Sequence, residues 1–199
     1  GDKGKNTGGM GAYSPSRLNS IELEKKIINK IILPTLKYLK KKRSIYVGFL
    51  YAGLMIKNME PYLIEYNVRM GDPECQTILP LLNNDLVELI DSCVNGTLNK
   101  LEISWKNKKS ICIVLTSKGY PEKFENNILI KDLEKLIYKN NQYIFHAGTK
   151  LSGEKLFSTG GRVLNFVSID EDLKFARINA IKLIKSLNWE NGFYRSDIG

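Results

Sequence analysis

A chain of 199 residues with 43% hydrophobic residues is long enough to form one large or two small globular domains. It has no apolar run of about 18 residues and no charged-then-apolar amino-terminal signal, so the sequence predicts neither a membrane span nor secretion and favours a cytoplasmic location. The net charge of +9 is compatible with nucleic-acid binding, but most lysines are dispersed among Asn and Ile, which makes nucleic acid the weaker alternative.

The amino-terminal 18 residues are rich in Gly, Ser, Asn and Pro, a composition that predicts a loop. Asn19 and Glu22 match a capping box that would open a helix with an isoleucine-rich face. Pro34 must end or kink this helix, or serve as the first residue of a second helix that reaches Lys42. The one dense basic run, residues 40–43, then lies at a helix carboxyl end, where cations are favourable.

Residues 45–56 alternate and run apolar, which predicts a strand, and residues 57–60 turn the chain back into a second strand, Pro61–Val68. The two strands would form a β-hairpin. Asp72 and Pro73 fit an N-cap and a first helical position, so we expect a helix over Glu74–Leu82. Asp85 is expected to cap a further helix that ends near Gly96.

The character of the chain changes from about Thr97 onward. Short apolar strands are predicted at Ser110–Thr116, Tyr143–His146 and Arg162–Ile169, and a final helix at Glu171–Leu187 after an Asp170 cap. We interpret this region as a second, smaller α/β domain. The predicted domains are residues 1–97 and 98–199.

The sequence contains three cysteines, Cys75, Cys93 and Cys112, and their spacing does not match that of metal ligands. They are expected to be reduced and at least partly buried, and a catalytic thiol is disfavoured.

The densest concentration of reactive side chains is the stretch from Glu65 to Glu74. Because side chains alternate along a strand, Glu65 and Asn67 should share one face, opposite Ile64, Tyr66 and Val68. Two oxygen ligands suit a hard cation such as Mg²⁺, which takes its other ligands from phosphates and water. Arg69 would lie on the same face if the strand continues. A solvated strand edge followed by a turn explains the same residues without a metal.

For other polar residues, both a functional and a structural interpretation are open. Gly8 and Gly9 would let backbone N–H groups approach an anion, or would form a flexible loop. His146, the only histidine, is more plausibly structural than catalytic. Lys150 and Arg162 flank a glycine-rich turn and would either hold a phosphate or be surface charges. Tyr194, Arg195 and Asp197 are expected to pack and form an ion pair near residue 199.

Six segments, taken together and in order, resemble the glycinamide ribonucleotide synthetase family, also called phosphoribosylamine-glycine ligases, of purine biosynthesis. The segments are Asn6–Pro15, Tyr46–Met55, Glu65–Glu74, His146–Lys150, Thr159–Asn165 and Tyr194–Gly199. The resemblance covers the whole chain but only the C-terminal half of the family's enzyme. It implies an α/β (α+β) fold: part of an ATP-grasp domain followed by a small mixed α/β C-terminal domain.

The resemblance implies a ligase that joins glycine to 5-phosphoribosylamine through glycyl phosphate, using ATP and Mg²⁺ (or Mn²⁺). Glu65 and Asn67 match the family's metal ligands. Arg69 and Asp72 match catalytic positions: Arg69 is the guanidinium near the transferring phosphate, and Asp72 belongs with Glu74 to an acidic turn at the substrate pocket. The residues expected to bind substrate or phosphate are Asn6, Thr7, Gly8, Gly9, Glu74, Lys150 and Arg162.

The chain departs from the family pattern at Lys5, where proline is usual, at Met70, where phenylalanine is commoner, and at Cys75, where threonine is commoner. The family's glycine-rich lid and ATP-holding lysines are not recognisable in it. We therefore expect a fragment, a processed chain or one half of a split enzyme that needs the missing N-terminal half as its partner. The alternative is a non-enzymatic phosphate-binding or structural remnant, with a nucleic-acid binder less favoured.

Overall fold

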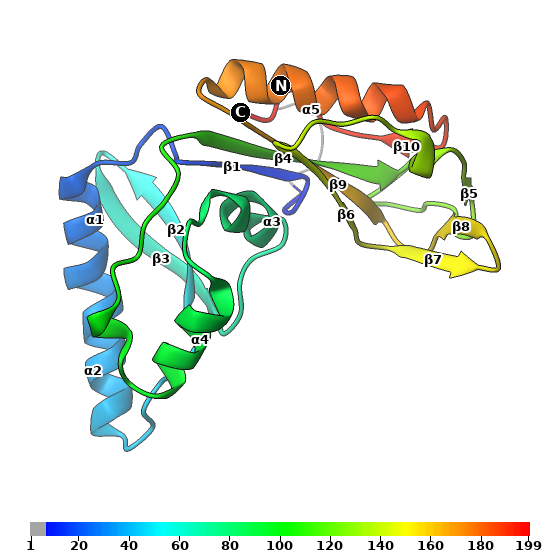
Figure 1. Ribbon diagram of the computed structural model, residues 1–199. Coiled ribbons are helices and arrows are strands. Elements are labelled where there is room, and N and C mark those ends of the chain that lie inside the picture. The colour runs from blue at the N-terminus through cyan, green and yellow to red at the C-terminus, as the bar shows by residue number, and fades with distance from the viewer. Residues whose placement is uncertain (1–6) are drawn as a thin grey trace. The chain divides into compact units, whose positions relative to one another are not determined.

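The computed structural model describes residues 7–199 as helices packed on antiparallel sheets (Figure 1), which confirms the mixed α/β class. Backbone packing divides the chain into two units. The first contains the chain up to residue 14 with residues 72–81 and 106–199, and the second contains residues 15–71 and 82–105. The two units interleave along the sequence, whereas two consecutive domains are predicted from sequence. The predicted boundary after residue 97 stays a prediction.

The first unit is built on a five-stranded antiparallel sheet in which β4 is paired on both sides. Its strands are β1 (Gly11–Ser14), β4 (Lys109–Ser117), β6 (Gln142–His146), β9 (Arg162–Asp170) and β10 (Gly192–Phe193). The order is β1-β4-β9-β6, and β10 pairs with the end of β4. Strands β4, β6 and β9 match the three predicted in this region. Strand β1 corrects the predicted loop over residues 1–18, because its pairing with β4 is a contact between distant segments that local composition does not encode.

The core of this unit lies between the sheet and α5 (Leu173–Leu187), which runs along one face of the sheet (Figure 1). Ala176, Ala180 and Ile184 are buried against Ile113 and Phe166. Small residues at helical spacing let the helix approach the strands closely, and burial of the larger side chains drives the packing. The helix is capped by Asp172, whose side chain accepts from the Lys174 N–H. The predicted Asp170 cap is wrong because β9 extends through that residue.

Smaller elements complete the first unit. These are α3 (Glu74–Ile78), η2 (Leu79–Leu81), β5 (Leu129–Ile130), η4 (Leu133–Lys135), β7 (Thr149–Ser152) and β8 (Lys155–Ser158). Strands β5, β8 and β7 form a three-stranded sheet. The α3 helix contacts β1, β4 and β9. It is shorter than the predicted helix over Glu74–Leu82, whose second half is a 3-10 turn.

The second unit begins with a continuous helical segment of three parts. They are α1 (Ile21–Ile27), the π-helical η1 (Ile28–Ile32) and α2 (Leu33–Lys41). Ser20, rather than Asn19, is the N-cap, because its side chain accepts from the Leu23 N–H. Pro34 lies in the first turn of α2, as the prediction of a second helix starting at this proline places it, although the helical segment continues from α1 through η1 without a break.

A two-stranded hairpin and one more helix complete the second unit. The elements are β2 (Tyr51–Lys57), β3 (Glu60–Asn67), α4 (Leu86–Val94) and η3 (Leu98–Lys100). The two-residue turn at Asn58 and Met59 has both residues at positive φ, which matches the twist of the strands. The hairpin was predicted, but residues 45–50 lie outside β2. The Asp85 cap of α4 is confirmed by bonds from the Val87 and Glu88 N–H groups. Within residues 7–199, no helix is long and apolar enough to cross a bilayer.

Candidate functional site

Glu65 and Asn67 lie side by side near the end of β3. The Asn67 Nδ2 donates to Glu65 Oε1 at 3.1 Å, so the two side chains point to the same side, as strand alternation predicts. On the other face, the Tyr66 hydroxyl bonds the Ile31 carbonyl and the Thr35 hydroxyl. The pair therefore presents carboxylate and amide groups to solvent from a strand that is anchored to the helical segment behind it.

A β-bulge immediately precedes Glu65. Gly53 pairs with Glu65 but Leu54 pairs with Leu63, so Ile64 is an extra residue on β3. Bulges bend a strand locally and change the direction of the following side chains. Ile64 is 64% exposed. Its exposure follows from its place outside the regular pairing.

Gly53 makes room for the Glu65 side chain on the neighbouring strand. A Cβ at Gly53 would stand 3.1 Å from Glu65 Cγ, closer than side chains normally approach. Sequence reasoning missed this glycine, although an isolated glycine inside an apolar strand is a signal of close approach. In the part of the chain that the structure describes, no group of three or more His, Cys, Asp or Glu side chains could hold a metal. A cation here would have Glu65 and Asn67 as protein ligands, the small ligand number that suits Mg²⁺ bound with phosphate.

Arg69 follows the hairpin in a bend rather than in the strand. Strand β3 ends at Asn67, so the continuation to Arg69 that would place it on the Glu65 face does not occur. Its Nη1 donates to the Met70 carbonyl at 2.9 Å, and the side chain is exposed.

In the first unit, Asp72 and Arg162 form the main polar cluster. Arg162 Nη1 donates to the Asp72 carbonyl at 2.7 Å and to the Gly9 carbonyl at 3.4 Å, while Nη2 lies 3.1 Å from Asp72 Oδ2. The other carboxylate oxygen of Asp72 accepts from Gln76 Nε2 at 3.0 Å. These contacts occupy three of the five guanidinium N–H donors and leave two for an anion.

These contacts correct the prediction that Asp72 caps α3. The N-cap position is Pro73, with no side-chain cap, and both Asp72 oxygens are engaged by Arg162 and Gln76 instead. The pairing joins residues 90 positions apart, so it had no local signal. Glu74 lies in the first turn of α3.

Gly9 is required for the close approach of Arg162. It has φ +77, and a Cβ there would stand 2.5 Å from Arg162 Nη1. Gly8 has nothing within 4 Å of the corresponding position. Thr7 is the first described residue, and Asn6 lies outside the described residues.

The turn before Arg162 is held by residues that sequence reasoning did not select. The Ser117 N–H donates to the Gly161 carbonyl and its hydroxyl to the Gly160 carbonyl, at 2.8 and 2.9 Å. A Cβ on Gly161 would meet the Tyr120 ring at 2.1 Å, so the ring lies directly against the glycine backbone. Ser117 ends an apolar strand, which gives it no distinguishing pattern.

The remaining candidates are dispersed. Lys150 is exposed on β7, opposite Phe157. His146 Nδ1 lies 2.9 Å from the Thr149 hydroxyl, a local bond consistent with a structural role. Arg195 and Asp197 form the expected ion pair at 2.7 Å.

Cys75 and Cys112 are poor nucleophiles because of their surroundings. Desolvation raises the pKa of the buried Cys112 thiol far above its usual range and also raises the pKa of Cys75, where the Asp72 charge adds to the effect. None of the three cysteines is in a disulfide, and all are at least partly buried, as expected.

Comparison with known proteins identifies the two ends of the chain separately. Residues 1–75 match the family model described as phosphoribosylglycinamide synthetase, ATP-grasp (A) domain, and residues 110–199 match phosphoribosylglycinamide synthetase, C domain. A phosphoribosylamine–glycine ligase of Fusobacterium nucleatum is 42% identical over 199 residues, which are 100% of this chain and 47% of that relative. The chloroplastic enzyme of Arabidopsis thaliana is 41% identical over 203 residues, which cover 100% of this chain and 38% of that relative.

Solved structures give the same relationship. The phosphoribosylamine–glycine ligase of Thermotoga maritima superposes with a TM-score of 0.85 at 34% identity, over 100% of this chain and 48% of that one. A biotin carboxylase of Campylobacter jejuni superposes with a TM-score of 0.60 at 15% identity, over 94% of this chain and 39% of that one. At this identity the likeness shows a shared fold alone. The chain spans about half the length of the curated relatives it matches.

Proposed function

Because this chain belongs to the phosphoribosylglycinamide synthetase family, we propose that it supplies the metal- and phosphate-binding part of a ligase that joins glycine to 5-phosphoribosylamine. The glycine carboxylate would attack the γ-phosphate of ATP, giving glycyl phosphate and ADP. The amine of phosphoribosylamine would then displace phosphate from the acyl carbon, giving glycinamide ribonucleotide. The protein's contribution to such chemistry is mainly positioning and charge stabilisation.

The observation that carries this proposal is the placement of Glu65 and Asn67 together opposite Gly53. The carboxylate and the amide oxygen would hold Mg²⁺ (or Mn²⁺), which neutralises phosphate charge when it is bound. The amide orientation in which Asn67 Nδ2 faces Glu65 is one of two, and a rotated amide would present its oxygen instead.

Arg69 is proposed to face the transferring phosphate. Its single observed bond is to a main-chain carbonyl, so its remaining N–H groups are open to phosphoryl oxygens. For Asp72, the pairing with Arg162 supports a positioning role in the substrate pocket rather than proton transfer.

Of the proposed phosphate and substrate contacts, Gly9 and Arg162 lie together, whereas Lys150 is separate on β7. Arg162 would use its two remaining donors, and the main-chain N–H groups of the glycine loop would add to it. The proposed residues are Asn6, Thr7, Gly8, Gly9, Glu74, Lys150 and Arg162.

The chain covers only 47% of the length of the Fusobacterium nucleatum enzyme, so the proposed partner is a protein segment that supplies the rest of that length. We propose that catalysis needs the rest of the relatives' length, including the nucleotide-holding segments that are not recognisable here. Cytoplasmic location and the absence of nucleic acid as a partner remain predictions.

A chimera tests the proposal in a full-length context. The matched 199-residue segment of the Fusobacterium nucleatum ligase is replaced with this chain, and formation of glycinamide ribonucleotide from glycine, phosphoribosylamine and ATP is measured. We expect turnover by the chimera and none by this chain alone.

Arg69→Lys in the chimera should lower kcat far more than it raises the KM for ATP. Lysine cannot reproduce the two parallel bonds of a guanidinium, and loss of one preorganised donor costs about a hundredfold. A folded chimera without turnover would contradict the proposed function, and wild-type kcat in the lysine variant would remove Arg69 from the catalytic residues.

A further inference from the structure

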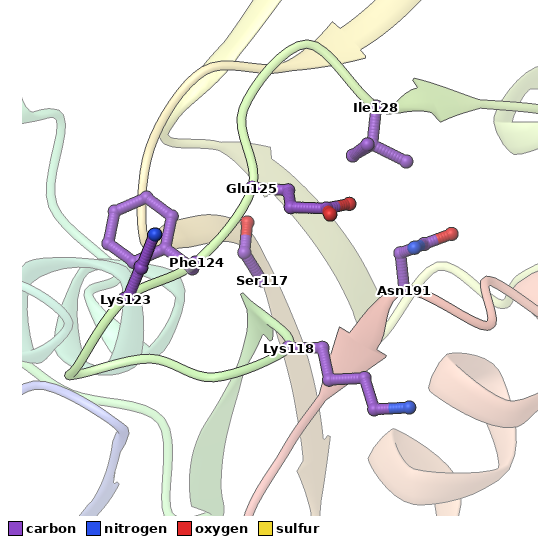
Figure 2. Close-up of a pocket in the computed structure, with 7 residues that line it drawn as sticks. All are labelled: Ser117, Lys118, Lys123, Phe124, Glu125, Ile128 and Asn191. Atoms are coloured by element: carbon purple, nitrogen blue, oxygen red, sulfur yellow. The ribbon is translucent and has the colours of Figure 1, made fainter.

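A pocket of about 470 Å³ lies in the first unit, and one of its lining residues, Ser117, also holds the Gly160–Gly161 turn that precedes Arg162. It is lined by Ser117, Lys118, Lys123, Phe124, Glu125, Ile128 and Asn191 (Figure 2). This volume lies within the range of about 300–1,000 Å³ typical of small-molecule sites.

The loop that forms the pocket is held in place by its own contacts. The Lys118 N–H donates to the Asn191 carbonyl at 2.8 Å, which joins the two sides of the pocket. The Tyr120 and Phe124 rings meet edge to face with centroids 6.0 Å apart, and both rings lie close to the Gly161 backbone. These contacts connect the pocket wall to the neighbouring backbone, which would lower the ordering cost of binding.

The charged groups of this pocket are not paired with each other. Among residues 7–199, neither the Glu125 carboxylate nor the Lys118 ammonium forms a salt bridge, although both line the same space. Figure 2 shows the Glu125 carboxylate and the Asn191 amide directed toward the same side of the pocket, with Ile128 above them and Lys118 below. One wall thus offers an acceptor for a cation, and another offers donors for an anion.

A phosphate group does not fit this arrangement well. Lys118 and Lys123 border different sides of the pocket in Figure 2, Lys123 at the left and Lys118 at the bottom, so the two ammonium groups do not converge on one anion. The carboxylate would also repel a doubly charged ligand. A ligand that carries one positive and one negative group satisfies both walls.

We propose that this pocket binds a free α-amino acid with an apolar side chain. The ligand ammonium would pair with Glu125, its carboxylate with Lys118 and the Asn191 amide, and its side chain would contact Ile128. This inference goes beyond the proposed ligase function, because the pocket shares no residue with the proposed metal and phosphate contacts and a glycine substrate would leave the apolar wall uncovered.

Nuclear magnetic resonance titration of the chain with L-leucine, without nucleotide or metal, tests the proposal. We expect saturable shifts at pocket residues with a Kd of about 1 mM or lower. Glu125→Gln and Lys118→Met should each weaken binding by on the order of tenfold, because each removes a charge-assisted contact. Glu154→Gln in the β7–β8 turn and Lys155→Met at the start of β8 are exposed charge changes; they are the matched controls and should bind as the wild type does.

Ligand analogues separate a zwitterion site from general hydrophobic binding. Leucinamide lacks the carboxylate and 4-methylpentanoate lacks the ammonium, so both should bind at least about tenfold more weakly than leucine. Glycine should also be weaker, since it has no side chain for the apolar wall. Absence of saturable leucine binding, equal binding of the analogues, or full binding by both pocket variants would each overturn the proposal. These outcomes are independent of ligase turnover, which is measured on the chimera.

Discussion

Two neighbouring glycines, Gly8 and Gly9, differ in what their surroundings allow. Gly9 adopts φ +77 and faces the Arg162 guanidinium, whereas Gly8 has open space where a side chain would begin. The difference matters because Arg162 bridges the glycine loop to Asp72 through main-chain carbonyls. The absence of a side chain at Gly9 thus lets the Arg162 guanidinium reach both main-chain carbonyls, and this positions the proposed phosphate contacts.

Gly9→Ala should therefore destabilise the chain and Gly8→Ala should not. Left-handed backbone costs alanine about 1–2 kcal/mol, and the new Cβ would also displace Arg162. Urea unfolding of both variants measures the difference. The free energy of unfolding of the Gly8 variant should stay within about 1 kcal/mol of the wild-type value. Equal stability of the two variants would contradict the role given to Gly9.

Part of this detail was accessible from sequence. Strand alternation brought Glu65 and Asn67 together correctly, because side-chain direction in a strand depends only on local geometry. The Asp72–Arg162 pair was not accessible, since it depends on how distant segments fold onto each other. The bulge at Ile64 likewise depends on the register of the neighbouring strand.

At the scale of elements, one carboxylate links the helical segment to the hairpin. Glu60 at the start of β3 pairs with Lys26 of α1 and, at 2.6 Å, with Lys30 of η1. Hydrogen bonds from these two lysines lower the pKa of Glu60 to about 2. Because Lys26 and Lys30 lie one helical turn apart, both reach the same carboxylate.

The lowered pKa of Glu60 predicts a pH-dependent contribution to stability. The folded pKa is below the unfolded value, so the contribution is full above about pH 4.5 and is lost as pH falls toward about 2. The melting temperature of the wild type should exceed that of Glu60→Gln at pH 6, and the two should converge near pH 2. Asp197, whose pKa is also lowered through its bond with Arg195, is present in both proteins and does not affect the comparison.

The control is the double variant Lys26→Met with Lys30→Met. In that background, adding Glu60→Gln should no longer change the pH dependence, since the cause of the pKa shift is gone. A constant difference between wild type and Glu60→Gln from pH 6 to pH 2 would show that the ion pairs do not stabilise the fold.

The elements themselves were mostly predictable, and their ends less so. The Asp85 cap and the hairpin turn rest on short-range rules, and both are present. Ser20 and Asp172 replace Asn19 and Asp170 as caps, because several residues near each helix start were able to accept the N–H bond. Strand β1 was missed because its hydrogen bonds all go to β4, about 100 residues away.

At the scale of the whole molecule, the chain crosses between its two units more than once, so neither unit is one continuous segment. The proposed metal ligands belong to the second unit, and the Asp72–Arg162 cluster belongs to the first. The family resemblance implies functional roles for both groups of residues, and these roles stay predictions. No local pattern indicated that residues 72–81 leave one unit and join the other.

The most direct measurement is the Mg²⁺ dependence of turnover in the chimera with the Fusobacterium nucleatum ligase, at saturating ATP. Glu65→Gln removes the charged ligand but keeps its size, and it should raise the Mg²⁺ concentration for half-maximal rate on the order of tenfold or more, with Asn67→Ala giving a smaller shift. The exposed Glu154→Gln is the control and should leave the titration unchanged. A Glu65→Gln chimera with the wild-type rate and Mg²⁺ dependence would contradict the proposal that this hairpin holds the metal.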